Sequence, residues 1–411
     1  MRDFIISNKA GELEKLYRRD KTEFRRQFDN IYPEIKDYLL ANFWQERLHY
    51  SSEKASRAGK AEWVFIIIST LLAGLLAKLP DIFSLDEELF YLRNSGFIIF
   101  PFLAGFFIWK NKFSITKTAI LAIIVIASLL YINLLPNDKN SDTFILACLH
   151  LPFLLWALFG VSFVGNDPGY SEKRLDFLRF NGDLLVTMAF LVLSGVIFTG
   201  ITLGLFELIG VQIVKFYFDY VVVFGLPAVP IAGMFLNYTN PQLVNRVSPV
   251  IARIFSPLVL AMLVVYLGTL ILTGKNLYTD REFLLLFNIL LIGVMALIFF
   301  SVAKISLKQY SAEKWVLFLL SLVTILVNSI ALSAILFRIS EWGITPNRLA
   351  VLGANMLILL QMFIVTFRLY QAIAKKPSAQ LIGSSIVNYL PVYVAWAVIV
   401  VFLFPFIFNF T

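Results

Sequence analysis

Residues 184–209 read LLVTMAFLVLSGVIFTGITLGLFELI, an apolar stretch of 26 residues in which Glu207 is the one charged residue. A helix that crosses the hydrocarbon core of a bilayer, about 30 Å thick, needs roughly 20 such residues. The stretch therefore predicts a membrane-spanning helix. It is the longest of a series of similar blocks, and these blocks decide the fold class.

The composition of the whole chain agrees with that stretch. Hydrophobic residues make up 59% and charged residues 15% of the 411 positions, whereas soluble domains are nearer half apolar and a quarter charged. We predict an all-α protein, a polytopic transmembrane helical bundle of about eleven spans. The spans are predicted near residues 63–79, 97–109, 115–135, 144–164, 184–209, 217–236, 255–273, 283–303, 315–337, 348–369 and 388–410.

Residues 1–62 form a charged tail, and residues 63–411 form the predicted bundle. No cleavable signal peptide is visible, because the first apolar block begins only at Trp63. The tail predicts two amphipathic helices, over 11–28 and 33–60, separated by a break at 29–33 that ends in Pro33. Its apolar side chains recur at spacings of three, four and seven: Leu13, Leu16, Tyr17, Phe24, Phe28, Leu40, Trp44 and Leu48.

These apolar stripes of the tail must be covered by something. The candidates are each other, the surface of the bilayer, the cytoplasmic face of the bundle, or a partner protein. We prefer packing of the tail on itself to a partner site. The single cysteine, Cys148, lies inside an apolar block and is expected to be a small buried residue rather than part of a disulfide framework.

The charges of the loops give an orientation. The tail holds 13 Lys and Arg against 11 Asp and Glu, loops after even-numbered spans 14 against 5, and loops after odd-numbered spans 8 against 11. Positive residues in short loops stay on the cytoplasmic side. We therefore expect a cytoplasmic tail and a periplasmic Thr411. The net charge of +8 favours an anionic leaflet over nucleic acid as its partner.

A further amphipathic stretch, Ser171–Phe180, lies in the loop after the fourth span. It predicts a short interfacial helix, with Leu175, Leu178 and Phe177 or Phe180 at the lipid boundary. Lys173, Arg174 and Arg179 would then reach the headgroups.

Ionisable residues at membrane depth are the default candidates for function. Glu207, Lys215 and Asp219 lie in a run without a clear turn, where Lys215 and Asp219 are four residues apart and could form an ion pair. We prefer an outer interfacial helix here to a re-entrant ligand site. His150, near Pro152 in the fourth span, is expected to be neutral and bonded to a carbonyl or hydroxyl rather than to carry protons.

Motifs for chemistry are missing from the sequence. There is no His-Glu-x-x-His, Gly-x-Ser-x-Gly or P-loop, and Asp183 has no second membrane aspartate with which to share a proton. We expect no enzyme activity, no metal and no cofactor. The run 224–230, with Gly225, Pro227 and Pro230, should interrupt the sixth span, and we prefer kinked packing to a substrate path there.

Residues 338–348 read RISEWGITPNR, between the ninth and tenth spans. Gly343 can take the left-handed conformation that ends a helix, Thr345 can cap the next one, and Pro346 suits its first position. A tight helical turn is predicted, with Trp342 at headgroup level. Glu341 is placed to bond Arg338 one turn back or Arg348 across the turn.

Together with FWQERL at 43–48 and the Gly225-Leu226-Pro227 break, this turn resembles the bacterial membrane family described as "domain of unknown function 4153". The resemblance implies a bacterial inner-membrane protein and carries no activity. It implies that Arg338, Glu341 and Arg348 form a fixed structural or ligand site, of which we prefer the structural interpretation.

We expect a non-enzymatic accessory or scaffold protein of the cell envelope, with membrane lipids as partners and a possible protein partner held through tail positions such as Trp44. The alternative is a transporter or lipid-handling protein that uses the broken spans of 184–273. It predicts a polar cavity near Gly225–Gly233 and His150. An enzyme is the third and least favoured class.

Overall fold

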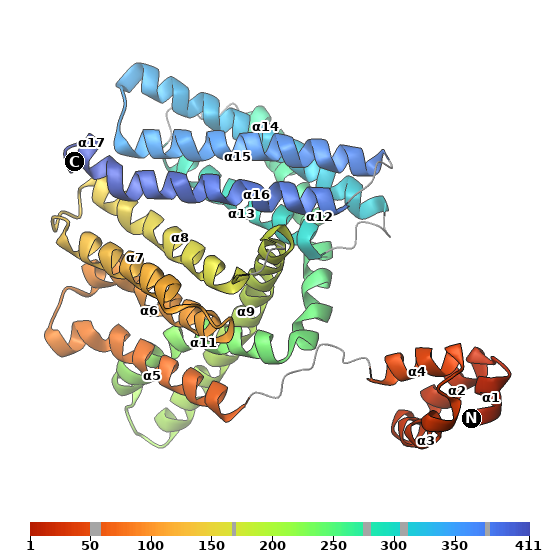
Figure 1. The fold of residues 1–411 in the computed structure, drawn as a ribbon. Helices are drawn as coiled ribbons and strands as arrows, with labels where there is room; N and C mark the ends of the chain where they lie inside the picture. Colours follow the sequence, from red (N-terminus) through yellow and green to blue (C-terminus); the bar gives the residue numbers. More distant parts are fainter. Residues whose placement is uncertain (50–58, 167–169, 274–280, 305–310, 375–378) are drawn as a thin grey trace. The chain divides into compact units, whose positions relative to one another are not determined.

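The computed structural model describes residues 1–49, 59–166, 170–273, 281–304, 311–374 and 379–411 (Figure 1). All regular elements in these ranges are helices, and ten of them are long and apolar enough to cross a membrane. The prediction of an all-α polytopic bundle is confirmed. The chain divides into two compact units, Met1–Arg57 and Ala58–Thr411, which are called the N-terminal unit and the membrane unit below.

The N-terminal unit contains α1 (Arg2–Ile6), α2 (Ala10–Arg19), α3 (Lys21–Ile35) and α4 (Leu39–His49). The predicted helix boundaries are wrong at two places. A break falls at Asp20, whose carboxylate accepts a hydrogen bond from the Glu23 N–H at 2.9 Å, and α3 continues through Pro33 to Ile35. The added turn buries Ile35 in the core of the unit. This burial offsets the cost of the backbone hydrogen bond that Pro33 cannot donate. Residues 50–58 of the predicted second helix lie outside the described ranges.

The apolar stripes of the tail pack on one another, as expected. Leu13, Phe24, Phe28 and Trp44 are almost fully buried in one cluster. The Trp44 ring lies 4.9 Å from that of Phe24 between centroids, and the Arg47 guanidinium covers it at 4.5 Å. Aromatic pairs of this kind contribute to stability beyond the area that they bury.

The eleven predicted spans all coincide with helical segments of the membrane unit. Ten of these segments satisfy the length and hydropathy of a span, and α13 adds a shorter apolar stretch, Phe287–Ala303. The segments are α5 (Lys60–Phe83), α6 (Glu87–Lys110), α7 (Ile115–Leu134), α8 (Asp142–Val164), α9 (Tyr170–Leu208), α10 (Val214–Phe216) with η1 (Tyr217–Val222) and α11 (Val223–Thr239), α12 (Pro241–Thr273), α13 (Arg281–Lys304), α14 (Ser311–Trp342), α15 (Pro346–Ile373), and α16 (Ala379–Val398) with η2 (Ile399–Leu403) and α17 (Phe404–Ile407).

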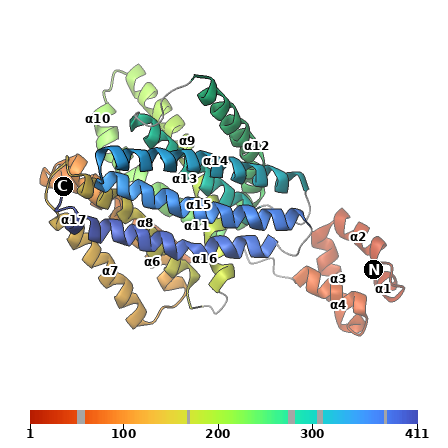
Figure 2. The same cartoon turned by 90° about the horizontal axis from the view of Figure 1, so that it is seen from above.

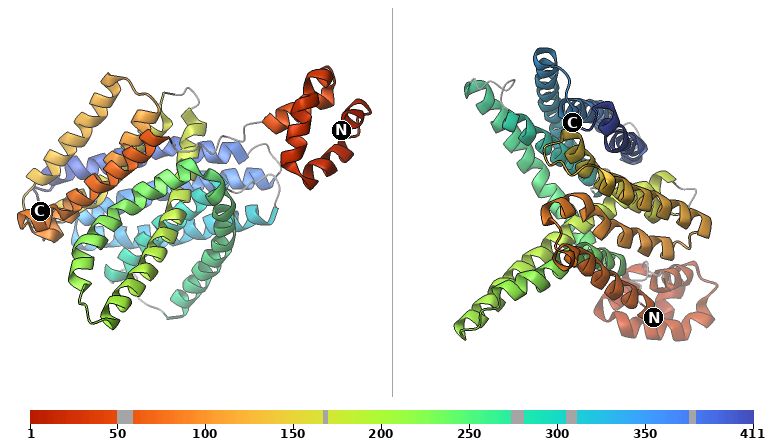
Figure 3. Two further views of the ribbon diagram at one scale, coloured as in Figure 1. Left: turned by 90° about the horizontal axis from the view of Figure 1, so that it is seen from below. Right: turned by 90° about the vertical axis from the view of Figure 1, so that its left-hand side faces the viewer.

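Two groups of helices, which can be followed in Figures 2 and 3, pack around separate cores. Helices α5, α6, α8, α9 and α11 enclose Phe106, Phe159 and Met234. Helices α12 to α16 enclose a second cluster that includes Leu320 and Met362, and α14, α15 and α16 lie side by side in Figure 2. The α8 helix belongs to both arrangements, because it also contacts α15 and α16.

The predicted interfacial helix at Ser171–Phe180 is wrong. These residues are the first turns of α9, a continuous helix of 39 residues. Phe177 is buried against Gly160 of α8, and Leu175 lies over Gly383 of α16. The apolar face therefore meets protein instead of lipid. An amphipathic pattern indicates that the apolar face of a helix is covered, but it does not show whether protein or lipid covers it.

Alternate loops of the membrane unit lie at opposite ends. Lys139 forms ion pairs with Asp86 at 3.2 Å and Glu88 at 2.6 Å, and Ser141 Oγ donates to the Phe410 carbonyl at 2.9 Å. The α14–α15 turn lies at this same end, which we call the Asp86 end, since the residue pair Leu349–Ala350 packs with α17. It comprises residues 84–86, 135–141, 343–345 and 408–411.

The opposite end of the membrane unit, which we call the Asn111 end, comprises residues 59–62, 111–114 and 165–166. Asn111 donates through Nδ2 to the Ser162 carbonyl at 2.7 Å. Lys117 bonds Asn166 in the same region. Loops after odd-numbered and even-numbered spans are thus separated in this part of the bundle, as helices that each cross a membrane once require.

Candidate functional site

The turn between α14 and α15 has the local structure that the sequence predicts. Gly343 has a φ of +78°, and its N–H donates to the Ile339 carbonyl at 2.9 Å. Thr345 caps α15 by accepting from the Arg348 N–H, and Pro346 occupies the first position of that helix. The capping chemistry of the sequence therefore determines this turn.

Arg348 closes the turn through backbone acceptors. Its Nη1 donates to the carbonyls of Trp342, at 2.9 Å, and Gly343, at 2.7 Å. Glu341 was placed to bond either Arg338 or Arg348, and neither ion pair is found within the described ranges, where Glu341 is exposed. The last carbonyls of a helix lack intrahelical partners, and the guanidinium satisfies two of them. Arg338 also lies at the Trp342 ring, with its Cζ 5.4 Å from the centroid.

His150 is bonded within its own helix. Its Nδ1 lies 2.9 Å from the Leu146 carbonyl, so this nitrogen must donate. No contact joins His150 to another predicted site residue in the part of the chain that the structure describes. The arrangement is the self-satisfied histidine that the sequence favours over a proton carrier.

The structure separates Glu207, Lys215 and Asp219. A turn that the sequence did not predict lies between them: α9 ends at Leu208, and Gly210 has a φ of +78°. Glu207 and Lys215 are exposed. The segment after the turn, 214–239, is long and apolar enough to cross a membrane.

The predicted ion pair between Lys215 and Asp219 is also wrong. Asp219 lies in the π-helical turn η1, and no ion pair between it and Lys215 is found among the described residues. Asp219 instead interacts electrostatically with Lys78 of α5. Lys78 forms an ion pair with Asp81 and lies 4.7 Å from the Tyr220 ring. Lys78 was not among the predicted site residues, although a lysine within an apolar block is a usable signal.

In the Gly225–Pro230 region, Pro227 and Pro230 are buried, whereas Gly225 and Leu226 are exposed. Helix α11 runs through both prolines, and the irregularity lies one turn earlier, in η1. A Pro ring clashes with the carbonyl four residues back, which a π-turn just upstream relieves. Gly233 faces α9, because a Cβ at this position would lie 3.1 Å from the Leu184 side chain and 3.5 Å from that of Met188. Its neighbour Met234 is fully buried.

Glu62 and Lys110 form a buried ion pair at the Asn111 end that was not predicted. Glu62 is 5% exposed, pairs with Lys110 through Oε1, and accepts from the Gly59 N–H through Oε2 at 2.8 Å. The Lys110 Nζ lies 5.3 Å from the Tyr238 ring. This pair joins α5, α6 and α11. Glu62 and Lys110 each flank an apolar block in the sequence, and this position is the signal that could have predicted the ion pair.

Three amides lie buried among α14, α15 and α16: Asn328, Asn355 and Gln361. Asn328 Nδ2 donates to the Asn355 carbonyl at 3.0 Å, and Gln361 Nε2 to the Ile386 carbonyl at 3.3 Å. Asn328 Oδ1, Asn355 Nδ2 and Gln361 Oε1 have no hydrogen-bond partner among the residues that the structure describes. From the sequence, only the ionisable side chains of the spans were considered as candidates, so these neutral amides were missed.

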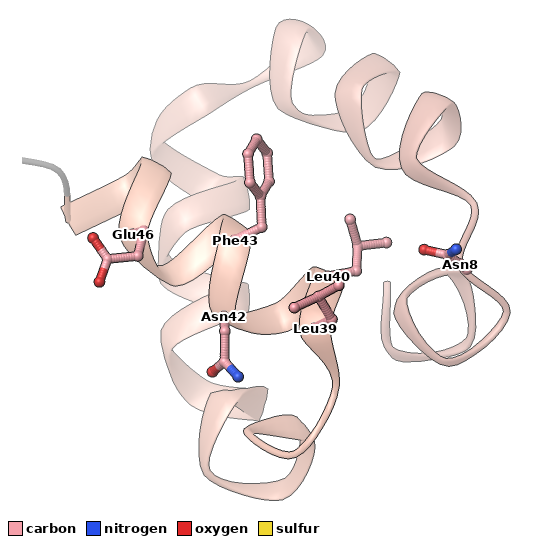
Figure 4. A pocket seen from close by; sticks show the side chains of 6 residues that line it. All are labelled: Asn8, Leu39, Leu40, Asn42, Phe43 and Glu46. Atoms are coloured by element: carbon pink, nitrogen blue, oxygen red, sulfur yellow. The ribbon is translucent and has the colours of Figure 1, made fainter.

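The N-terminal unit carries an open groove of about 480 Å³ (Figure 4). Leu39 is 88% and Phe43 58% exposed, whereas the next residue, Trp44, is 1% exposed. The expectation of a contact through Trp44 is therefore wrong, because this side chain is part of the core. The groove is lined by Asn8, Leu39, Leu40, Asn42, Phe43 and Glu46.

No group of three His, Cys, Asp or Glu that could hold a metal ion occurs among the residues that the structure describes. Comparison of the chain with protein-family models, curated proteins and solved structures finds no match in any of the three.

Proposed function

We propose that this chain is a membrane-embedded accessory or scaffold protein whose N-terminal unit holds a protein partner at the membrane. The observation that carries the proposal is the groove beside Leu39 and Phe43 on a unit whose core is already complete. Large apolar side chains exposed to water favour a partner that covers them. No chemistry by this chain is needed for that role.

The groove fits an amphipathic helical segment of a partner protein. Leu39, Leu40 and Phe43 offer an apolar floor, and Glu46 at its border favours a basic residue in the partner. The exposed side chains recur at spacings of three and four along α4, so that one face of one helix is presented. Asn8 and Asn42 supply hydrogen-bonding groups at the rim.

The test is site-specific photo-crosslinking in native membranes. A photoreactive residue replaces Phe43 in one variant and Lys15, an exposed residue of α2, in the control. We expect one reproducible protein adduct from position 43, none from position 15, and loss of that adduct when Leu39→Ala is added. Equal adduct patterns from both positions, or no protein adduct from position 43, would refute the proposal.

We also propose the inner membrane of a bacterium as the location. The N-terminal unit and the Asn111 end would be cytoplasmic, and the Asp86 end with Thr411 periplasmic. The surplus of Lys and Arg in loops after even-numbered spans supports this orientation. The resemblance of the 338–348 turn to the bacterial family supports the organism class. Lipids of that membrane would be constant partners.

A transporter or lipid-handling protein is the second candidate, and the buried amides favour it. Three of their polar atoms have no partner among the described residues, and unpaired polar atoms at membrane depth are costly unless a polar solute or water binds them. The test uses Asn328→Cys in a Cys148→Ser background, with a membrane-impermeant thiol reagent. Labelling would support a water-filled path, and an unreactive thiol would count against it.

A further inference from the structure

Asn328 and Asn355 are buried where α14 meets α15, with 0% and 2% of their surface exposed. Asn328 Nδ2 donates to the Asn355 carbonyl at 3.0 Å. This bond fixes the orientation of the Asn328 amide, so that its Oδ1 is an acceptor. Neither Asn328 Oδ1 nor Asn355 Nδ2 has a hydrogen-bond partner among the described residues. Two residues in direct contact therefore leave one acceptor and one donor unpaired.

A second amide pair of the membrane unit shows an arrangement that needs no ligand. Asn94 of α6 and Asn133 of α7 bond one another, with distances from Nδ2 to Oδ1 of 3.2 Å and 2.9 Å. Each Nδ2 also donates to a carbonyl four residues earlier in its own helix. Buried polar atoms are almost always paired with protein or with ordered water. The unpaired atoms of Asn328 and Asn355 therefore call for a third group.

The surroundings of the pair require this group to be neutral. Residues 315–337 of α14, 349–367 of α15 and 379–398 of α16 contain no Asp, Glu, Lys, Arg or His. A charged ligand would find no counter-charge on these helices, and an unpaired charge is costly at membrane depth. The ligand must also donate to Asn328 Oδ1 and accept from Asn355 Nδ2. Water meets all of these conditions and fits a closely packed helix contact.

We propose that a buried water joins α14 to α15, donating to Asn328 Oδ1 and accepting from Asn355 Nδ2. A bridge of this kind is nearly as favourable in enthalpy as a direct hydrogen bond. Gln361 lies six residues farther along α15, about 9 Å away along the helix axis, and bonds α16 instead. It is not part of this site.

The inference does not depend on the proposed scaffold role. It uses two of the amides that favour the second candidate function, but a water held by both helices needs no path for a solute. An unreactive thiol at position 328 would count against transport and would leave the bound water unaffected.

The first test is the sign of a stability change. Asn355→Leu exchanges the amide for an apolar side chain of similar size and keeps the backbone carbonyl that Asn328 bonds. With a bound water, the variant leaves Asn328 Oδ1 without its bridge, and the thermal midpoint of the purified full-length protein in detergent should fall by about 2 °C. Without a water, the variant only removes an unpaired buried donor. A raised or unchanged midpoint would overturn the proposal.

A double variant separates the water from steric strain. Asn328→Leu alone removes both the direct bond and the acceptor of the water. In the Asn355→Leu background it should lower the midpoint less, because the bridge is already lost. Equal falls in the two backgrounds would contradict a shared water. The matched control is Ser329→Ala, whose hydroxyl bonds the Ile325 carbonyl of its own helix at 2.8 Å; its midpoint should be that of the wild type.

The direct test is a crystal structure of the full-length protein at a resolution that shows ordered water. We expect one isolated peak at about 2.7–3.2 Å from both Asn328 Oδ1 and Asn355 Nδ2, and no such peak in Asn355→Leu. A direct bond between the two side chains, the absence of a peak, or the several short oxygen contacts of a metal cation would overturn the proposal.

Discussion

The N-terminal unit and the membrane unit use the same apolar side chains under opposite conditions. Among residues 1–49 of the N-terminal unit, four large apolar residues are exposed: Ile6, Tyr38, Leu39 and Phe43. In the membrane unit exposure is general along the lipid-facing helices, as for Leu193 at 58% and Val265 at 68%. Apolar side chains that face lipid tails carry no free-energy penalty for being exposed on the protein surface. The exposure of Phe43 therefore calls for an explanation, whereas the exposure of Leu193 does not.

Polar and charged groups show the opposite distribution between the two units. The N-terminal unit leaves its ion pairs at the surface, as in the Lys15–Glu12 pair. The membrane unit buries Glu62 with Lys110 and encloses the amides of Asn328 and Gln361. Exposed pairs contribute little to stability, while a buried charge depends on its partner. The informative residues are thus exposed apolar ones in the first unit and buried polar ones in the second.

The largest expected effect comes from Trp44→Ala. Loss of a fully buried Trp costs about 3–5 kcal/mol, comparable with the whole stability of a small unit. We expect rapid proteolysis within residues 10–49 of the full-length protein in detergent, with an unchanged thermal midpoint of the membrane unit. Phe43→Ala, one residue earlier, should resist protease like the wild type. Equal sensitivity of the two variants would contradict the division into core and surface.

A smaller effect is expected at the Asn111 end. Lys110→Met leaves the Glu62 carboxylate buried without its partner and should cost about 3 kcal/mol. The double variant Glu62→Gln/Lys110→Met should recover most of that loss, because the amide can still accept from the Gly59 N–H. Denaturant titration of the purified protein measures both. Additive losses in the double variant would show that the two residues are not coupled.

The sequence predicted those features that depend on local or one-dimensional signals. The apolar blocks predicted the spans because the thickness of the bilayer fixes their length. The 338–348 turn formed as expected, because Gly343, Thr345 and Pro346 act on the backbone within a few residues. Their spacing alone fixed the positions of Arg338 and Trp342 on one face of α14.

Features that depend on distant partners were not predictable in this way. The apolar face of residues 171–180 meets α8, α13 and α16, which its amphipathic pattern cannot distinguish from lipid. Asp219 has a Coulomb interaction with Lys78, which lies far earlier in the chain and forms its ion pair with Asp81. Likewise Leu39, rather than Trp44, proved exposed, since only the packing of α2 and α3 shows which face of α4 is covered.

The smallest expected effect is a pH dependence confined to the N-terminal unit. Hydrogen bonds from Arg18 and then from Arg47 hold the pKa of Glu14 below its ordinary value of 4.5. A carboxyl whose pKa is lowered in the folded state contributes stability above its ordinary pKa and loses it as the pH falls through the folded value. The unit should therefore loosen below about pH 4.5, with little change between pH 6 and 8.

The two partners of Glu14 give this prediction its control. Arg47 belongs to α4 and also covers the Trp44 ring at 4.5 Å, so protonation of Glu14 releases a contact between α2 and α4. The pKa of Glu23 is lowered by Gln27 and Arg26 of its own helix. The emission of Trp44, isolated by difference from a Trp44→Phe variant, should lose part of its acid transition in Glu14→Gln and little of it in Glu23→Gln. The reverse order would place the acid-sensitive contact within α3, and the comparison of the two units would then rest on their apolar residues alone.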